Sequence, residues 1–548
     1  MSFDKEELIQ QLNHYVISEE DKNFIYGTAG FRTAATRLVG IAFRIGIMAV
    51  IRSMQERGAV IGIMVTASHN EASDNGLKVV DKGGEMLDES WEEIAVQFIR
   101  TNVDDVPDFI NEICINRNID ISIRGSVFLG EDNRNTSNAI SKIVARGIQV
   151  LFGKCTYFGK ITTPQLHFLV RKQNNLESGK SITNIYSYFQ QICGSFERLI
   201  YPEKIIHNSS LYVDCANGIG ARHLSSIIQF LQPHLNYIHV CNSDPTGNII
   251  NLKCGADFIK SKMQFPIIHN GDVSDINEND RWASIDGDAD RLIYFFKNNG
   301  KLCILDGDKQ AVLIAKFLKE LLASIGNWNP EDIKLGVVQT AYANFNCTKT
   351  LIENIGVPVV CVPTGVKYLH HTGKELDIRI YFETNGHGSI LLSKRARIYL
   401  NKYLDSEHPL RFILLNGLIN EAVGDSFSIL LLIEHILSCY NLSLNSWFDM
   451  YHEYPSSLLQ VKIRDRRAIS TTNCERTVSK PVKLQQNINE KMLEFGKGFM
   501  SRVFVRPSGT EDIVRVYAES ENQEVAALVA TEVARLVYDQ VGGIGIRP

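Results

Sequence analysis

Apolar segments of strand length alternate with helix-like segments along most of this chain, and this alternation restricts the fold more than any other feature. Ile61–Val65 and Leu335–Val338 are apolar runs of strand length, and the helix-like stretch Phe317–Leu322 precedes the second of them. Strands that alternate with helices are typical of α/β units, so we expect an α/β protein with largely parallel sheets. Such sheets bind ligands in the loops after the carboxyl ends of their strands.

The chain has 548 residues. A chain of this length is too long for one compact core and predicts about three or four domains. Its last part differs from the rest, because two strand-like runs, Arg502–Val505 and Ile513–Glu519, precede a helical stretch with one apolar face. The apolar positions of that face are Val525, Leu528, Val529, Val533, Leu536 and Val537. We expect an α+β module there.

The composition is that of an ordinary globular protein, with 44% hydrophobic and 22% charged residues. The 57 basic and 62 acidic residues give a net charge of −5, which argues against nucleic acid or an anionic membrane as a partner. The eleven cysteines contain no CxxC pair and predict reduced thiols.

The N-terminal segment lacks the pattern of a signal peptide, and no apolar stretch is long enough to span a membrane. We expect a cytoplasmic protein that is a monomer or a weak dimer.

Ser68 stands in the loop that follows the apolar run Ile61–Val65. The loop Thr66–Asn70 places its hydroxyl at a strand end, where α/β folds bind ligands, so Ser68 is a candidate nucleophile. Ser and Asn also cap helices and form turns, which is the alternative role for this loop.

Three carboxylates at alternate positions, Asp286, Asp288 and Asp290, precede the strand-like run Leu292–Phe296. Closely spaced oxygen donors suit Mg²⁺ or Ca²⁺. An EF-hand loop needs Glu at its twelfth position, and Lys297 stands there, so that kind of calcium site is excluded. An acidic hairpin turn in solvent is the other interpretation.

Two further loops carry candidate binding residues. Arg506–Asp512, with Arg515 on the next strand, combines arginines, hydroxyls and a glycine amide, which suit a phosphate dianion. A plain hairpin turn is the alternative for this loop. Glu383–Gly388 follows the strand-like run Ile378–Phe382, and its carboxylate and amide groups suit the hydroxyls of a sugar. His387 receives no catalytic role, because a histidine in such a loop is more often structural.

Together the four loops predict one active site assembled from several domains. A serine hydroxyl near a cation, with a separate phosphate anchor and a sugar-binding loop, is suited to moving a phosphoryl group between serine and a sugar.

The sequence resembles the α-D-phosphohexomutase superfamily and, within it, the branch that acts on N-acetylglucosamine phosphates. The resemblance covers nearly the whole chain. It is carried by Tyr26–Arg32, Thr66–Asn70, Asp74–Gly76, Lys78, Asp286–Arg291, Glu383–Gly388 and Arg506–Asp512. It implies three related α/β domains with mixed sheets and a C-terminal α+β domain around a central cleft. The implied domains are 1–184 with the serine loop, 185–300 with the metal loop, 301–450 with the sugar loop and 451–548 with the phosphate loop.

The resemblance also implies the reaction, an interconversion of N-acetylglucosamine 6-phosphate and 1-phosphate on the route to UDP-N-acetylglucosamine. Ser68 would carry the phosphoryl group, with a sugar 1,6-bisphosphate as primer and intermediate. The implied Mg²⁺ ligands are Asp286, Asp288, Asp290 and an oxygen of phospho-Ser68. The implied sugar-binding residues are Glu383, Thr384 and Asn385, and the implied phosphate-binding residues are Arg506, Pro507, Ser508, Gly509, Thr510 and Arg515. Relatives that act on glucose or mannose phosphates typically have Ser in place of Asn385.

Proton transfer to and from the sugar requires a residue close to Ser68. Lys78 is the first candidate, with His69 and Arg32 in support, and Lys367 is the alternative. A solvated surface lysine is the ordinary role for either lysine.

This chain departs from many relatives at two places. Glu71 follows Asn70 where they have Pro, and Gly130–Asn135 replaces Gly-Arg-Asp-x-Arg-Pro. Without the proline we expect a slightly looser serine loop. Three other functions compete with the mutase: a phosphoglucomutase or phosphomannomutase, a phosphatase that hydrolyses the phosphoserine, and a non-catalytic phosphosugar-binding scaffold. A scaffold would be expected to lack the serine or a metal carboxylate, and this chain has all of them.

Overall fold

The computed structural model describes residues 4–27, 30–176, 180–201, 209–271, 275–326, 328–405, 407–509 and 511–548. The chain divides into two compact units. The first contains Met1–Asp306, Asn385–Ile390 and Leu400–Leu444, and the second contains Gly307–Thr384, Leu391–Tyr399 and Asn445–Pro548.

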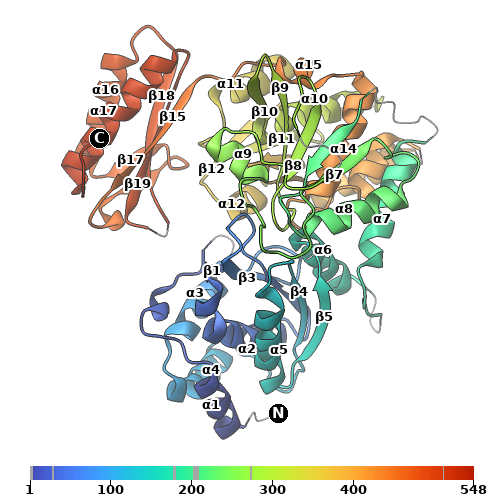
Figure 1. Cartoon of the computed structure of the whole chain (residues 1–548), viewed down its shortest axis with the longest axis vertical. Coiled ribbons are helices and arrows are strands. Elements are labelled where there is room, and N and C mark those ends of the chain that lie inside the picture. The colour runs from blue at the N-terminus through green and yellow to red at the C-terminus, as the bar shows by residue number, and fades with distance from the viewer. Residues whose placement is uncertain are drawn as a thin grey trace. The chain divides into compact units, whose positions relative to one another are not determined.

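The first unit begins with a mixed five-stranded sheet in the order β1-β3-β2-β4-β5 (Figure 1). β2 pairs in parallel with β4 and antiparallel with β3, and β3 pairs antiparallel with β1. The loop between β2 and β3 is too short for a crossover, so β3 returns antiparallel to β2. The expectation of largely parallel sheets is therefore wrong for this sheet. Its strands are β1 Phe31–Ala34, β2 Val60–Val65, β3 Asp74–Val80, β4 Ser126–Glu131 and β5 Lys154–Lys160.

Helices cover both faces of this sheet. Ile61, Ile63 and Val65 of β2 belong to one buried core with residues of α2 and α5. A Cβ added to Gly62, which faces the other way, would lie 2.9 Å from Val170 of α6, so α6 packs closely on the opposite face. The helices of this region are α1 Lys5–His14, α2 Val39–Gln55, α3 Glu89–Arg100, α4 Val106–Asn116, α5 Ser137–Val150 and α6 Thr163–Asn174.

A second five-stranded sheet in the first unit repeats this pattern, in the order β10-β9-β8-β6-β7. β6 pairs in parallel with β7 and β8, whereas β9 pairs antiparallel with β8 and β10. Asn299 and Gly300 have φ of 51° and 73° and form the two-residue turn between β9 and β10. The strands are β6 Leu211–Asp214, β7 Ile238–Cys241, β8 Arg281–Ile285, β9 Leu292–Asn298 and β10 Lys301–Leu305. The helices are α7 Tyr186–Leu199, α8 Gly220–Phe230, α9 Ala256–Lys262 and α14 Ser426–Tyr440.

A four-stranded sheet in the order β12-β11-β13-β14 has its first three strands in the second unit, and β11 is parallel to both of its neighbours. α10 packs against β11 and β13. The strands are β11 Leu335–Thr340, β12 Val359–Val362, β13 Ile378–Phe382 and β14 Gly388–Leu392. The helices are α10 Gly307–Ala323, α11 Phe345–Lys349, α12 Val366–His371, α13 Lys394–Tyr403 and α15 Leu444–Phe448.

The C-terminal part of the second unit is the expected α+β module. An antiparallel sheet in the order β15-β19-β18 packs against α17. Val529, Val533 and Val537 are buried as predicted, but Leu528 is 43% exposed because the buried face continues through Ala526 and Ala530. The elements are β15 Ser456–Lys462, β16 Ser470–Thr472, β17 Thr477–Lys480, α16 Val482–Phe495, β18 Ser501–Pro507, β19 Ile513–Ser520 and α17 Gln523–Val541.

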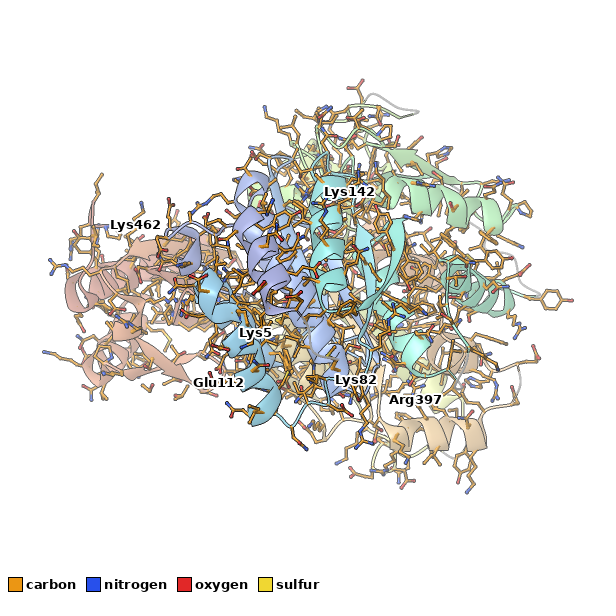
Figure 2. All side chains as sticks on the ribbon, turned by 90° about the horizontal axis from the view of Figure 1, so that it is seen from below. Lys5, Lys82, Glu112, Lys142, Arg397 and Lys462 are labelled. Atoms are coloured by element: carbon orange, nitrogen blue, oxygen red, sulfur yellow. The ribbon has the colours of Figure 1, made fainter. Side chains whose placement is uncertain are left out.

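The sheets and helices confirm the predicted fold class, α/β with mixed sheets and a terminal α+β module. The domain boundaries at residues 184, 300 and 450 stay predictions. The described part of the chain contains no helix with the length and apolar character that crossing a membrane requires. Charged side chains such as Lys5, Lys82, Glu112 and Lys142 are exposed on the first unit (Figure 2).

Candidate active site

Ser68 lies in the loop after β2, as predicted, and its backbone is left-handed. Every residue of β2 is buried. Ser68 has φ of 53° and is 2% exposed. Residues other than glycine seldom adopt positive φ, and those that do are concentrated at functional sites. The surrounding structure must therefore hold this loop in place.

A buried arginine provides much of that hold. Arg134 is 2% exposed, and its Nε donates to Oδ2 of Asp132 at 3.0 Å. Its terminal nitrogens donate to four backbone carbonyls of the serine loop, those of Ser68, Asn70, Glu71 and Asp74. Asp132 also accepts from Thr66 Oγ1 at 2.7 Å, and that hydroxyl accepts from the Ser68 N–H at 3.0 Å.

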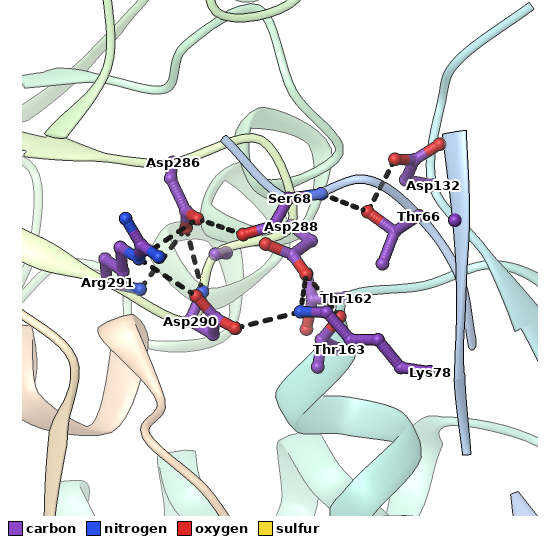
Figure 3. A network of polar contacts seen from close by, with 12 residues as sticks. Thr66, Ser68, Lys78, Asp132, Thr162, Thr163, Asp286, Asp288, Asp290 and Arg291 are labelled. Atoms are coloured by element: carbon purple, nitrogen blue, oxygen red, sulfur yellow. Dashed lines mark hydrogen bonds and ion pairs between the residues drawn. The ribbon is translucent and has the colours of Figure 1, made fainter. Parts of the chain in front are cut away.

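The three aspartates lie together beside Ser68 (Figure 3). Asp286, Asp288 and Asp290 are buried, and each offers a carboxylate oxygen within 4.8 Å of the other two. Ser68 Oγ donates to Asp286 Oδ2 at 2.8 Å across a sequence separation of 218 residues. The other oxygen, Asp286 Oδ1, accepts from the N–H groups of Asp290 and Arg291 at 3.1 and 3.3 Å. Two of the predicted loops therefore form one site.

Lys78 extends from β3 to the same carboxylates. Its Nζ donates to Asp288 Oδ2 at 2.6 Å and to Asp290 Oδ2 at 3.1 Å (Figure 3). Thr163, the first residue of α6, donates its hydroxyl to Asp288 Oδ2 at 2.6 Å. The N-terminus of α6 thus adds its partial positive charge next to this carboxylate.

These contacts separate the pKa values of the acidic groups. Burial and the neighbouring charges of Asp290 and Asp288 raise the pKa of Asp286 well above its usual range. Burial alone would raise the pKa of Asp290 too. Lys78 and the nearby His387 have the larger, opposite effect and hold the pKa of Asp290 well below its usual range. Burial would lower the pKa of the Lys78 ammonium group, but Asp288 and Asp290 have the larger effect and raise it. A compact group of buried carboxylates favours cations.

The donor set fits Mg²⁺. Asp288 Oδ1 and Asp290 Oδ1 are buried and accept no hydrogen bond within the described residues. Buried acceptors without a partner are costly, so an ion or water at these oxygens would be stabilising. Hard carboxylate oxygens are the ligands that Mg²⁺ prefers.

Arg32 and His69 lie in the electrostatic field of these groups. Burial and Arg291 lower the pKa of Arg32, while the three aspartates oppose the shift. His69 Nδ1 is buried without a partner in the described part of the chain. Burial, then Arg291 and Arg32, hold the pKa of His69 well below 6.5, so its ring is neutral at neutral pH. Lys367, the alternative proton-transfer residue, lies in α12 of the second unit.

The end of the predicted sugar loop lies against the aspartate loop. The Leu292 N–H donates to the Gly386 carbonyl at 3.1 Å. Gly386 has φ of 88°, and an added Cβ would lie 2.1 Å from the Leu292 carbonyl oxygen, so only glycine permits this approach. Asn385 Oδ1 accepts from the His387 N–H at 2.9 Å, and His387 Nδ1 lies 3.8 Å from Asp290 Oδ1. The other predicted sugar-binding residues, Glu383 and Thr384, belong to the second unit.

The predicted phosphate loop joins β18 to β19 in the second unit. Arg506 and Arg515 are directly opposite each other in the antiparallel register, so their side chains share one face of the sheet. Like charges in this arrangement repel unless an anion lies between them. The Ser508 N–H donates to the Ile513 carbonyl at 2.8 Å and closes the loop. Pro507 ends β18, Gly509 is exposed, and Thr510 lies outside the described residues.

Several residues that contact the site had no predicted role. Arg134 belongs to the segment Gly130–Asn135, which differs from many relatives, but nothing in that segment predicts its role. Thr163 follows an ordinary strand. Asn251 donates its amide to the carbonyls of Ser68 and Asn70, each at 2.8 Å. Arg291 donates to Asp257 Oδ1 at 2.8 Å. In the sequence it is simply the basic residue that follows the three aspartates. Donors to backbone carbonyls leave no pattern in a sequence.

Three segments match known protein families. Residues 306–442 match domain III of phosphoacetylglucosamine mutase AMG1. Residues 39–104 match the alpha/beta/alpha domain I of phosphoglucomutase/phosphomannomutase, and residues 460–536 match the C-terminal domain of the same group. A phosphoacetylglucosamine mutase of Sus scrofa is 42% identical over 532 residues, which are 95% of each protein.

Solved structures extend the likeness to the whole fold. The Aspergillus fumigatus N-acetylphosphoglucosamine mutase in complex with GlcNAc-6P and magnesium has a TM-score of 0.91 at 35% identity, covering 99% of this chain and 100% of that one. A serine-to-alanine variant in complex with glucose 1,6-bisphosphate has a TM-score of 0.89 at 34% identity, covering 98% and 99%. Fold and site together define the phosphohexomutase class. The chain belongs to the phosphoacetylglucosamine mutase family.

Proposed function

We propose that this chain interconverts N-acetylglucosamine 6-phosphate and N-acetylglucosamine 1-phosphate through a phosphoserine at Ser68 and a sugar 1,6-bisphosphate. The observation that carries the proposal is the 2.8 Å hydrogen bond from Ser68 Oγ to Asp286, within a buried group of three aspartates. The family supports the choice of sugar, and the Aspergillus relative binds GlcNAc-6P with magnesium. The 1-phosphate is the form required for the route to UDP-N-acetylglucosamine.

Ser68 would serve twice in the reaction. A sugar hydroxyl attacks the phosphorus of phospho-Ser68, the bond from phosphorus to Oγ breaks, and the sugar becomes the bisphosphate. After the bisphosphate turns over, Ser68 Oγ attacks the other phosphate, and the monophosphate leaves with a hydroxyl in its place. Lys78 is the first candidate for moving the proton, because its Nζ lies in the same buried group as Ser68, 2.6 Å from Asp288 Oδ2 and 3.1 Å from Asp290 Oδ2. His69, which is neutral, and Arg32 would support Lys78 in this role.

The residues that would hold Mg²⁺ are Asp286, Asp288, Asp290 and an oxygen of phosphorylated Ser68. The ion would supply positive charge to the transferring phosphoryl group. Asp288 Oδ1 and Asp290 Oδ1 are buried and accept no hydrogen bond within the described residues, which supports this ligand set.

The remaining roles concern substrate binding. We assign the sugar to Glu383, Thr384 and Asn385, because they form the polar turn after β13. The phosphate that is not transferred is assigned to the loop after β18, where two arginines share a face. Its residues are Arg506, Pro507, Ser508, Gly509, Thr510 and Arg515.

We also propose that the chain acts in the cytoplasm as a monomer or weak dimer, within the four domains expected from the sequence. The eleven cysteines form no disulfide within the part of the chain that the structure describes, which supports a reducing compartment.

The test is a direct assay with several sugars. Purified protein with Mg²⁺ and a trace of bisphosphate is incubated with N-acetylglucosamine 6-phosphate, and ³¹P NMR follows the 1-phosphate. We expect a clearly higher kcat/KM than with glucose 6-phosphate. Equal values for the two sugars would favour a general phosphoglucomutase or phosphomannomutase. Release of inorganic phosphate alone would indicate a phosphatase, and binding without reaction would indicate a scaffold.

A further inference from the structure

The tip of the β16–β17 hairpin places a carboxylate on the phosphate-loop arginine. Glu475 Oε1 accepts from Arg506 Nε at 2.8 Å, and Glu475 Oε2 accepts from the Thr364 N–H at 2.8 Å. The Arg506 and Glu475 side chains are only 14% and 18% exposed. Glu475 therefore joins the end of β18 to the segment before α12, with one oxygen for each partner.

The chemistry of the two partners requires a carboxylate here. Arg506 Nε–H and the Thr364 N–H are both donors, and an ionised carboxylate has two acceptor oxygens. Gln has the same shape but only one acceptor, so its NH₂ group would face one of the two donors. Asp has two acceptors but a shorter side chain. Glu is the residue that satisfies both partners at this distance.

The hairpin tip is held in an uncommon conformation. Asn473, Cys474 and Glu475 all have left-handed backbones, with φ of 52°, 55° and 67°. Consecutive residues other than glycine in this region cost free energy, so neighbouring contacts must stabilise them. Cys474 Sγ donates to the Cys361 carbonyl at 2.8 Å and provides one such contact. The tip is thus fixed independently at Cys474 and at Glu475.

The arginine that Glu475 holds lies at a point of charge repulsion. Arg506 is directly opposite Arg515 in the β18–β19 register. Burial disfavours the Arg506 charge, but Glu475 outweighs it and raises the pKa of the guanidinium. The bond to Nε uses the nitrogen nearest the backbone, so the pair of terminal nitrogens is the one that can still bind a phosphate bidentately.

We propose that Glu475 is a positioning residue for phosphate recognition. Its carboxylate fixes Arg506 through Nε, keeps the terminal nitrogens for the phosphate of the substrate, and ties the phosphate loop to the Thr364 segment. This role rests on the proposed function. A carboxylate that competed with the phosphate would have the opposite effect, because its removal would tighten substrate binding.

The experiment compares Glu475→Gln with Glu490→Gln. The control removes the same charge from an exposed position on α16 of the same module. Both variants are checked by thermal melting, and KM and kcat for N-acetylglucosamine 6-phosphate are measured separately. For Glu475→Gln we expect KM to rise about fivefold to tenfold with kcat within about twofold of the parent, because one buried donor loses its acceptor and Arg506 loses its orientation. Glu475→Asp is expected to raise KM as well.

The outcomes separate this inference from the proposed function. No turnover by the parent protein would overturn the proposed function itself. An active parent with a Glu475→Gln variant that matches the control would overturn the positioning role alone. A lower KM in that variant would also overturn it and would identify Glu475 as a competitor of the phosphate. A melting temperature close to the parent with the raised KM would support the role.

Discussion

Arg134→Lys should loosen the serine loop without unfolding the protein. The Arg134 side chain donates to five acceptors, one carboxylate oxygen of Asp132 and four loop carbonyls. An ammonium group has three N–H donors, so at least two acceptors lose their partner at about 1 kcal/mol each. Opening of the loop at residues 66–75 should become easier by about 2 kcal/mol, which is roughly 30-fold. We expect kcat to fall about tenfold, because a displaced nucleophile reacts slowly.

The assay is hydrogen–deuterium exchange on peptides that cover residues 66–75, with turnover measured in parallel. Local exchange is preferable to a global free energy of unfolding, because a chain with several domains does not unfold in one step. Arg124→Lys is the matched control, since exposed Arg124 donates Nε to the Phe152 carbonyl at 3.1 Å and has no other acceptor among the residues that the structure describes. Exchange and turnover that match this control would refute the role of Arg134.

Three further perturbations have defined outcomes. Asp288→Asn should weaken Mg²⁺ binding and lower turnover, because an amide lacks the charge that a hard cation needs, and parental turnover at limiting Mg²⁺ would contradict this. Asn385→Ser should narrow the preference for N-acetylglucosamine phosphate over glucose phosphate by about tenfold in kcat/KM, as measured with both sugars on both proteins. Burial lowers the pKa of His167, His223 and His435 to about 4, so only the unfolded chain binds their protons between pH 6.5 and 4. The stability that the three neutral histidines allow is complete above pH 6.5 and is lost as the pH falls to 4, by up to about 1.4 kcal/mol per histidine and pH unit. A series of melting temperatures over that pH range with no decrease would contradict this prediction.

The parts of the site that sequence could predict are local patterns. Ser68 follows an apolar run that matches the buried strand β2, and the three aspartates precede a strand-like run that matches β9. The residue types alone indicate a nucleophile and metal ligands. The run Ile378–Phe382 matches β13. The sequence predicts these features because strand burial and loop chemistry depend on residues that are neighbours in the chain.

The remaining features depend on contacts between distant segments. Arg134 and Asn251 act on backbone carbonyls, which every residue has, so no side-chain pattern marks their partners. Glu475 meets Arg506 only because a separate hairpin brings it there. The mixed strand order of the first sheet follows from the short return of β3, and the exposure of Leu528 follows from which side of α17 meets the sheet. Such properties are set by tertiary packing.

The central claim is that Ser68 carries the phosphoryl group, and the mass of the intact protein tests it most directly. The parent and Ser68→Ala are each incubated with a sugar 1,6-bisphosphate and Mg²⁺, analysed by mass spectrometry and assayed for turnover. We predict one phosphate on the parent, located by peptide mapping at Ser68, none on the variant, and a variant turnover below about a thousandth of the parent. A phosphate at another residue, or a variant that retains more activity than this, would contradict the account.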